Sequence, residues 1–134
     1  MTAELPRPGE VDADSAALSG LAASPGSARG PARIVRGLDD FASVRPGDVL
    51  VCPTTDPAWT PLFRIVAAVV TERGGLLSHA AIVARECGIP AVLAVPAATT
   101  ALGQGTRVRV DGDQGWVLPL TPRPLRRGNP RTSP

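Results

Sequence analysis

An α/β fold, with a compact mixed sheet core and a few short helices, is predicted by two patterns that alternate along the chain. Short apolar runs rich in Val, Leu and Ala at 48–53, 67–71 and 91–95 are typical of buried strands. Between these runs, the segments 54–66 and 78–87 carry the signals of short helices. Strands that alternate with short helices indicate a mixed sheet packed against helices.

The first part of the chain contains two further predicted elements. Residues 28–37 are predicted as a strand, in which Gly30 and Pro31 indicate an edge position or an irregular start. Residues 15–30 are rich in Ala, Ser and Gly, and we interpret them as a linker whose last residues begin this strand. Residues 38–48 are predicted as a short helical turn that a Pro-Gly pair closes.

The two predicted helices differ in the strength of their signals. Asp56 and Pro57 suit the start of the first helix, and Pro61 predicts that this helix is short. The second helix, 78–87, is the strongest in the chain, because Ser78 suits its N-cap and Gly88 the position just past its end.

The last part of the predicted domain is a turn followed by two strands. The turn is expected at 98–105, and the strands at 107–111 and 115–119. Arginine alternates with valine along 107–110, which is typical of a strand with one exposed face.

A chain of 134 residues has room for one domain with a real core. We assign this domain to residues 18–120 and expect disordered segments at 1–17 and 121–134. The net charge of +2 comes from four arginines in the last twelve residues, since the rest of the chain carries ten Arg against twelve acidic residues. The basic charge is therefore mostly an effect of the tail and is weak evidence for nucleic-acid binding. Few aromatic residues and no stripe of basic residues in the rest of the chain disfavour that function.

Several other classes of protein are disfavoured. Cys52 and Cys87 fit no CxxC pattern and the chain has one histidine, so we expect no metal site. We expect no structural disulfide either, because nothing in the sequence indicates export. The N-terminus lacks the basic and apolar regions of a signal peptide, and no apolar run approaches the roughly 20 residues of a membrane helix. We therefore expect a reduced, cytoplasmic protein with no membrane partner.

The single histidine, His79, follows Gly74-Gly75 and opens the second helix. Two glycines let another molecule approach the backbone closely. The first turn of a helix has unpaired N–H groups and the positive end of the dipole, which together stabilise a phosphate. A neutral imidazole is nucleophilic, so His79 could carry a phosphoryl group whose charge the helix start and the Ser78 hydroxyl stabilise.

Taken separately, these residues have ordinary explanations. A lone histidine near a helix start is most often a capping or solvated residue. Gly74-Gly75 alone is a turn signal, and Ser78 alone is an N-cap. Because a histidine at the end of a loop should be exposed, we expect its replacement by alanine to leave the stability nearly unchanged.

The longer string "GGLLSHAAIVARECGIPAV" closely resembles the phosphohistidine motif of the phosphoenolpyruvate-utilising enzymes, which include pyruvate phosphate dikinase, phosphoenolpyruvate synthase and rifampicin phosphotransferase. The strings "GDVLVCPTTDPAWTPLF" and "GTRVRVDGDQGWV" also resemble the swivelling domain of that family, and the resemblance covers roughly residues 18–118. It implies a swivelling β/β/α fold. Leu77 departs from the threonine of many dikinase-like members, which favours the rifampicin phosphotransferase and synthase-like branch.

The same resemblance implies roles for individual residues. His79 is the residue phosphorylated in the family motif, and Gly74, Gly75 and Ser78 shape its loop. Arg85 matches a family position, where it is either structural or faces the phosphate.

The resemblance also implies partners. In the family an ATP-grasp domain usually charges the histidine, and a barrel domain or another acceptor discharges it. The chain has no room for either, because a (β/α)8 barrel alone needs about 250 residues, and it has no Walker-type phosphate loop. We therefore expect no directly bound cofactor, and ATP or phosphoenolpyruvate with Mg on a partner. The chain is expected to be a phosphotransferase component, not a complete enzyme alone.

Three forms of such a component are open. The initial Met favours a stand-alone phosphocarrier, and a fragment of a larger enzyme or a degenerate relic are the alternatives. A non-catalytic module that docks to a kinase partner is a further hypothesis, which the complete motif argues against. Nucleic-acid binding through the arginine tail would be steeply salt-dependent.

Overall fold

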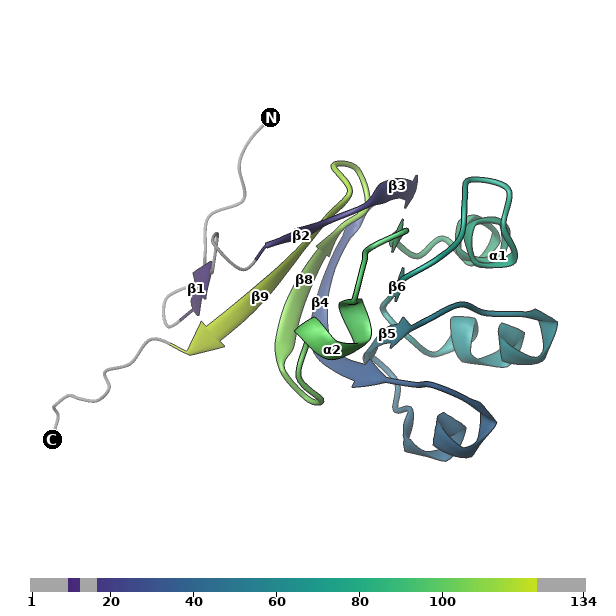
Figure 1. Cartoon of the computed structure of the whole chain (residues 1–134), viewed down its shortest axis with the longest axis horizontal. Helices are drawn as coiled ribbons and strands as arrows, with labels where there is room; N and C mark the ends of the chain where they lie inside the picture. The colour runs from purple at the N-terminus through teal and green to yellow at the C-terminus, as the bar shows by residue number, and fades with distance from the viewer. Residues whose placement is uncertain (1–9, 13–16, 123–134) are drawn as a thin grey trace, which may run out of the picture.

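The structure, a computed structural model of the chain, describes residues 10–12 and 17–122. Within them, nine strands form one sheet in the order β1-β9-β8-β4-β5-β6-β7-β3, and β2 also pairs with β9 (Figure 1). The elements are β1 (Glu10–Asp12), β2 (Leu18–Ser19), β3 (Leu21–Ser24), β4 (Ser27–Ile34), η2 (Leu38–Ser43), β5 (Val49–Cys52), η3 (Pro57–Arg64), β6 (Ala68–Thr71), α1 (His79–Cys87), β7 (Ala91–Leu93), α2 (Ala98–Ala101), β8 (Arg107–Asp111) and β9 (Trp116–Pro122).

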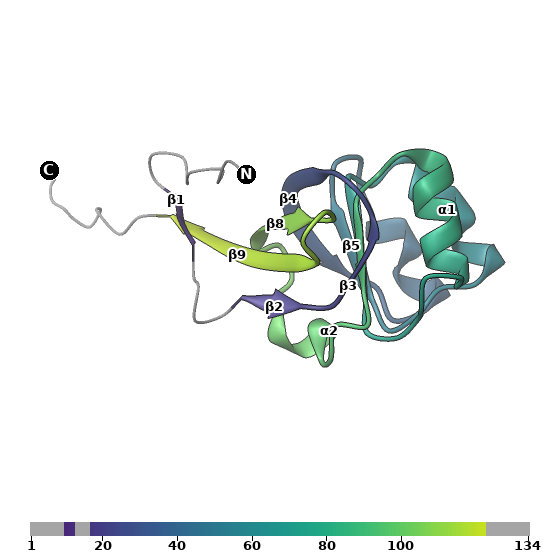
Figure 2. The same ribbon diagram turned by 90° about the horizontal axis from the view of Figure 1, so that it is seen from above.

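Strand β4 joins two parts of this sheet. Its first half pairs antiparallel with β8, and its second half pairs in parallel with β5. Strands β5, β6 and β7 continue the parallel part, and β3 closes its edge antiparallel to β7. The helices η2, η3 and α1 cover one face of the parallel part, while β8 and β9 lie on the other side (Figures 1 and 2). The predicted α/β class and the β/β/α arrangement are both confirmed.

Each parallel strand contributes side chains to two cores. In β5, Leu50 and Cys52 pack with the helices, whereas Val49 and Val51 pack with the valines of β8 and β9. All four side chains are buried. The central strands are covered on both faces, which is why their sequences are continuous apolar runs and show no period of two.

Residues 15–30 were expected to be a linker, and this interpretation is wrong for most of them. They contain β2, β3 and the start of β4. Strand β3 pairs with β7, which lies about seventy residues later in the chain, and β2 pairs with β9. Small residues give little periodic signal, so only the long-range pairing identifies these strands.

The expected edge position of the strand at 28–37 is also wrong, because β4 lies between β8 and β5. A Cβ on Gly30 would lie 2.3 Å from the Gly47 oxygen, so the glycine permits a close approach of two backbones. The irregularity at Pro31 coincides with the change of partner strand. Just beyond it, Ala32 N donates to the Thr106 oxygen (2.8 Å).

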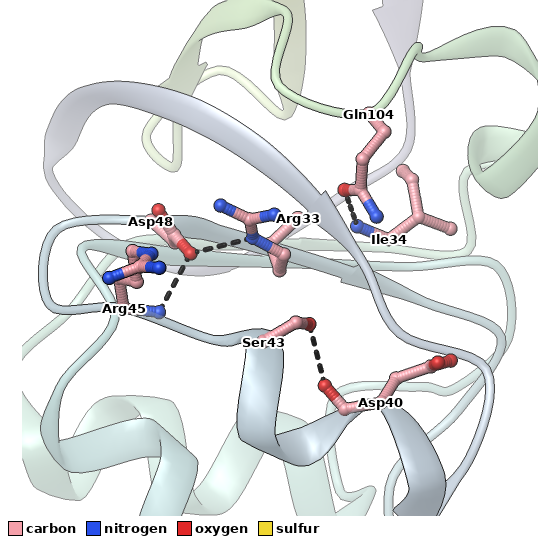
Figure 3. Close-up of polar contacts among 7 residues, drawn as sticks. All are labelled: Arg33, Ile34, Asp40, Ser43, Arg45, Asp48 and Gln104. Atoms are coloured by element: carbon pink, nitrogen blue, oxygen red, sulfur yellow. Dashed lines mark hydrogen bonds and ion pairs between the residues drawn. The ribbon is translucent and has the colours of Figure 1, made fainter.

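Polar side chains secure β4 after the change of partner (Figure 3). The Gln104 Oε1 atom accepts a hydrogen bond from Ile34 N (2.7 Å). Asp48, which is 2% exposed, accepts from the Arg33 Nε (2.9 Å) and from Arg45 N (2.8 Å). A buried carboxylate needs such partners, and here they tie the start of β5 to β4.

The predicted caps of both helical segments are confirmed. The Asp56 side chain accepts from Ala58 N (2.9 Å) at the start of η3, which is a 3-10 helix that contains Pro61. The Ser78 hydroxyl accepts from Ala81 N at the start of α1 (3.4 Å), and Gly88 ends it with a φ of 72°.

The short helix α2 lies where a turn was expected. The Glu72 carboxylate, from the end of β6, accepts hydrogen bonds from Thr99 N (2.8 Å) and Thr99 Oγ1 (2.6 Å) and so caps this helix. These two bonds hold the pKa of Glu72 below its usual value. Because Glu72 is far from α2 in sequence, no local pattern predicts this cap.

Two further expectations differ from the structure. Arg109 was placed on the exposed face of its strand, but it is 8% exposed. In the stretch 1–17, which was expected to be disordered, the structure places β1 (Glu10–Asp12) beside β9. The other residues of 1–16 lie outside the described residues, as do 123–134 of the expected C-terminal tail. In the described part of the chain, no helix has the length and apolarity needed to cross a membrane.

The two cysteines are free and differ in exposure, which predicts different thiol reactivity. Cys52 is buried, and this burial, together with the nearby Glu72 charge, raises its pKa from 9.0 to about 12. Cys87 is exposed. We expect a maleimide to label Cys87 rapidly in the native protein and Cys52 only at the rate of unfolding. Mass spectrometry of Cys87→Ser would check this, and rapid labelling of that variant would contradict the buried position of Cys52.

Candidate functional site

The site lies at the carboxyl ends of the neighbouring parallel strands β5 and β6. The loop after β5 and the glycine loop after β6, residues 72–78, leave the same edge of the sheet. Glu72 N donates to the Cys52 oxygen and Arg73 N to the Pro53 oxygen, each at 3.0 Å. The two loops therefore start side by side, and residues far apart in sequence meet there.

Short-range hydrogen bonds shape the glycine loop. Thr71 Oγ1 donates to the Arg73 oxygen (2.6 Å), and the Ser78 hydroxyl donates to the Gly75 oxygen (2.7 Å). Gly74 has a φ of 126°, which a side chain would strain, whereas a Cβ on Gly75 would meet no atom within 4 Å. Of the two glycines predicted to shape the loop, only Gly74 is required by its backbone conformation. The Ser78 hydroxyl is engaged in the loop and the cap, so its expected contact with a phosphate has no support here.

His79 is the first residue of α1, and its imidazole is held on three sides. Its Nδ1 lies 2.8 Å from Thr55 Oγ1, and its Nε2 lies 3.1 Å from Thr60 Oγ1. The ring also packs edge-on against the buried Phe63, with centroids 5.8 Å apart. The imidazole is half-buried, so the expectation of an exposed, solvated histidine is wrong.

This arrangement keeps the imidazole oriented whichever nitrogen carries the proton. A neutral imidazole has one N–H donor and one lone pair, and a threonine hydroxyl can donate or accept. Thr55 and Thr60 can therefore satisfy either tautomer by rotating their hydroxyl hydrogens. When the bond to the unprotonated nitrogen breaks, that nitrogen has a free lone pair, while the threonine on the protonated nitrogen still orients the ring.

Arg85 belongs to the support of this loop. Its Nη1 donates to the Ala23 oxygen (2.9 Å) and its Nη2 to the Leu76 oxygen (2.8 Å). Of the two roles that the sequence left open, these contacts support the structural one.

The sequence analysis assigned no role to Thr55, Thr60 or Phe63. The sequence did contain a signal for part of this site. The polar residues 54–56 follow the predicted strand 48–53, which is β5 in the structure. Since neighbouring parallel strands end at one edge of a sheet, these residues could have been placed near the glycine loop.

Three exposed apolar side chains lie within three residues of His79 in the sequence. The exposed fractions of Leu76, Leu77 and Ile82 are 51%, 85% and 42%, and Ile82 lies one helical turn after His79. We call these three residues the apolar collar. Between η3 and α1 lies a groove of about 390 Å³, and its lining residues are Thr60, Phe63, Arg64, Val83, Glu86, Cys87 and Ile89. No group of three or more His, Cys, Asp or Glu side chains that could hold a metal ion occurs among the described residues.

Comparison with known proteins identifies the family. Residues 44–115 match the model of the PEP-utilising enzyme, mobile domain. An uncharacterised phosphotransferase of Bacillus subtilis is 53% identical over 98 residues, which are 73% of this chain and 12% of that protein. A rifampicin phosphotransferase of Streptomyces sviceus is 45% identical over 106 residues, which are 79% of this chain and again 12% of the relative.

A solved structure agrees with these matches. The solution structure of an Enzyme I protein superimposes with a TM-score of 0.52 and 31% identity, over 59% of this chain and 33% of that chain. The chain therefore spans a small part of the length of its relatives. The string around His79 lies within the matched residues 44–115, and the chain belongs to the family of PEP-utilising enzyme mobile domains.

Proposed function

We propose that this chain carries a phosphoryl group on His79, accepts it from a separate ATP- or phosphoenolpyruvate-binding partner and passes it to an acceptor. The observation that carries the proposal is the imidazole of His79, held through both ring nitrogens at the first turn of α1. Membership of the mobile-domain family and relatives named phosphotransferases support it.

The chemistry is a direct displacement at phosphorus. The free lone pair of one ring nitrogen attacks the phosphoryl group, the N–P bond forms, and the bond to the leaving ADP or enolpyruvate oxygen breaks. The proton on the other nitrogen stays on the ring, held by its threonine. The N–H groups of the first turn of α1 have no helical acceptor and stabilise the added negative charge.

In this proposal, partners supply the phosphoryl donor and the phosphoryl acceptor. ATP and Mg bind on an ATP-grasp type partner, or phosphoenolpyruvate and Mg bind on another donor protein. A second protein or a small molecule accepts the phosphoryl group. The apolar collar around His79 is suited to contact with a partner surface, because exposed apolar clusters of this kind mark sites of protein association.

Labelling tests the proposal. The chain is incubated with radiolabelled ATP and an ATP-grasp protein encoded next to it, and in parallel with the small-molecule donor phosphoramidate. We expect one acid-labile, base-stable phosphoryl group per chain, which tandem mass spectrometry assigns to His79. Label on another residue, or no label with either donor, would contradict the proposal. Normal activity of the partner without any labelling would favour a non-catalytic docking module instead.

The two threonines are expected to contribute unequally to this reaction. The 3.1 Å contact of Thr60 with Nε2 is longer and weaker than the 2.8 Å contact of Thr55 with Nδ1, so Nε2 is the nitrogen more easily released for attack. Thr55→Val should then slow phosphorylation about tenfold, the equivalent of one hydrogen bond. Thr60→Val should change the rate less than about threefold. Rates with phosphoramidate measure this, and the reverse order would assign the attack to Nδ1.

A further inference from the structure

Arg85 connects the glycine loop to two distant parts of the fold. It lies in the last turn of α1, on the same helix as His79. One arm of its guanidinium donates to Ala23 in β3, and the other donates back to Leu76 in the glycine loop. A single planar side chain therefore spans helix, loop and sheet edge.

The hydrogen bond from Arg85 to the Leu76 carbonyl also orients the peptide between Leu76 and Leu77. Three carbonyl groups of the loop are held by side chains: that of Arg73 by Thr71, that of Gly75 by Ser78, and that of Leu76 by Arg85. In a planar trans peptide the N–H points opposite to the C=O. Because the Leu76 carbonyl points towards Arg85, the N–H of Leu77 points away from Arg85.

Within the described part of the chain, the backbone N–H groups of three consecutive exposed residues in the loop are unpaired. Among the described residues, none accepts a hydrogen bond from the backbone N–H of Gly75, Leu76 or Leu77. Thr71 and Ser78 make local bonds within three residues, whereas the bond from Arg85 comes from nine residues away. It is thus the contact that ties the loop to the last turn of α1, whereas Ser78 ties it to the first turn.

We infer that Arg85 is a positioning residue for phosphoryl transfer at His79, acting by orienting the peptide between Leu76 and Leu77. The inference rests on the proposed function. Its physical basis is preorganisation, since donors that are already oriented need no rearrangement when negative charge arrives.

The positive charge of Arg85 can be tested separately from its two hydrogen bonds. A cation in the last turn of a helix favours the helix dipole, and lysine would preserve that effect. Lysine cannot reproduce the planar fork that reaches two carbonyls at once. Arg85→Lys therefore keeps the positive charge and removes the paired hydrogen bonds to Ala23 and Leu76, while Arg85→Gln removes both the charge and the paired bonds.

Arg36 offers a matched control. It is also an exposed arginine that donates to a backbone carbonyl, that of Thr99 (3.1 Å). Among the described residues, it donates no hydrogen bond to the glycine loop, and only its charge acts on Glu72, the first residue of that loop. Arg36→Gln removes a comparable tether elsewhere in the fold.

The experiment measures the rate of His79 phosphorylation by phosphoramidate, well below the melting temperature of each full-length variant. In this reaction the imidazole nitrogen forms a bond to phosphorus, and the P–N bond of the donor breaks with release of ammonia. The half-life of the phosphohistidine after removal of the donor is measured in the same samples.

We expect Arg85→Lys and Arg85→Gln to slow phosphorylation about tenfold, the equivalent of one hydrogen bond to a charged group. Arg36→Gln should stay within about twofold of wild type, even where its melting temperature falls as far as that of the Arg85 variants. A wild-type rate in Arg85→Lys, or equal losses in all three variants, would overturn the inference while leaving the proposed function intact. A wild-type chain that takes up no phosphoryl group would overturn the proposed function, and this inference with it.

Discussion

Replacing His79 with asparagine is expected to remove all acid-labile phosphorylation from the chain, under conditions in which the wild type takes up one group. An amide nitrogen has no available lone pair to attack phosphorus. Asparagine can still reach Thr55, which contacts the Nδ1 position of the native ring, so the local structure should persist. Labelling with ATP and partner, and with phosphoramidate, measures the loss. Full labelling of His79→Asn would exclude His79 as the carrier.

The stability of His79→Ala decides between a chemical and a structural histidine. The half-buried imidazole makes two hydrogen bonds and an aromatic contact, so its removal should cost about 1–2 kcal/mol of unfolding free energy. This is more than the near-zero cost expected for an exposed histidine. Urea unfolding measures it. A cost above about 4 kcal/mol would mark a mainly structural residue, since values of that size arise from disrupted cores.

Replacing Gly112 with alanine is expected to destabilise the fold by about 3 kcal/mol, the upper part of the range for overpacked sites. A Cβ at this buried position would lie 1.9 Å from the Ser24 oxygen and 3.1 Å from the Pro90 Cβ. The Gly112 N–H also donates to the Gly26 oxygen (2.7 Å). Because these neighbours are backbone and a proline ring, they cannot turn aside as a flexible side chain would.

Gly37→Ala is the matched control for this prediction. A Cβ on Gly37 would meet no atom within 4 Å, and its φ of −171° is extended backbone that alanine adopts. Its unfolding free energy should stay within about 0.5 kcal/mol of wild type, as for surface substitutions in general. Equal losses in Gly37→Ala and Gly112→Ala would show that the cost comes from losing glycine and not from the contact with Ser24.

The turn that contains Gly112 matters because it packs the two sheet layers together. It connects β8 to β9 and rests on Ser24 at the end of β3 and on Pro90 just after α1. Strand β3 also receives a hydrogen bond from Arg85. Strain at Gly112 is therefore expected to weaken the support of the glycine loop as well as the global stability.

The sequence by itself determined the elements whose signals are local. Ser78 and Gly88 lie next to the ends of α1 that they cap, and the apolar runs of β5, β6 and β7 lie within single strands. His79 at the start of α1 follows from the same local pattern. The family resemblance, which depends on the string around His79, was confirmed by the comparisons.

Only the tertiary structure decided the features that depend on residues far apart in the chain. Strand β3 is defined by its pairing with β7, and helix α2 by its cap from Glu72, 27 residues before Thr99. The surroundings of His79 come from threonines 24 and 19 residues away. Local preferences do not specify such contacts, because the free energy that selects them comes from burial and hydrogen bonding across layers. The chain sequence thus determined which residue is the candidate phosphoryl carrier, and the packing of β5 beside β6 decided what holds it.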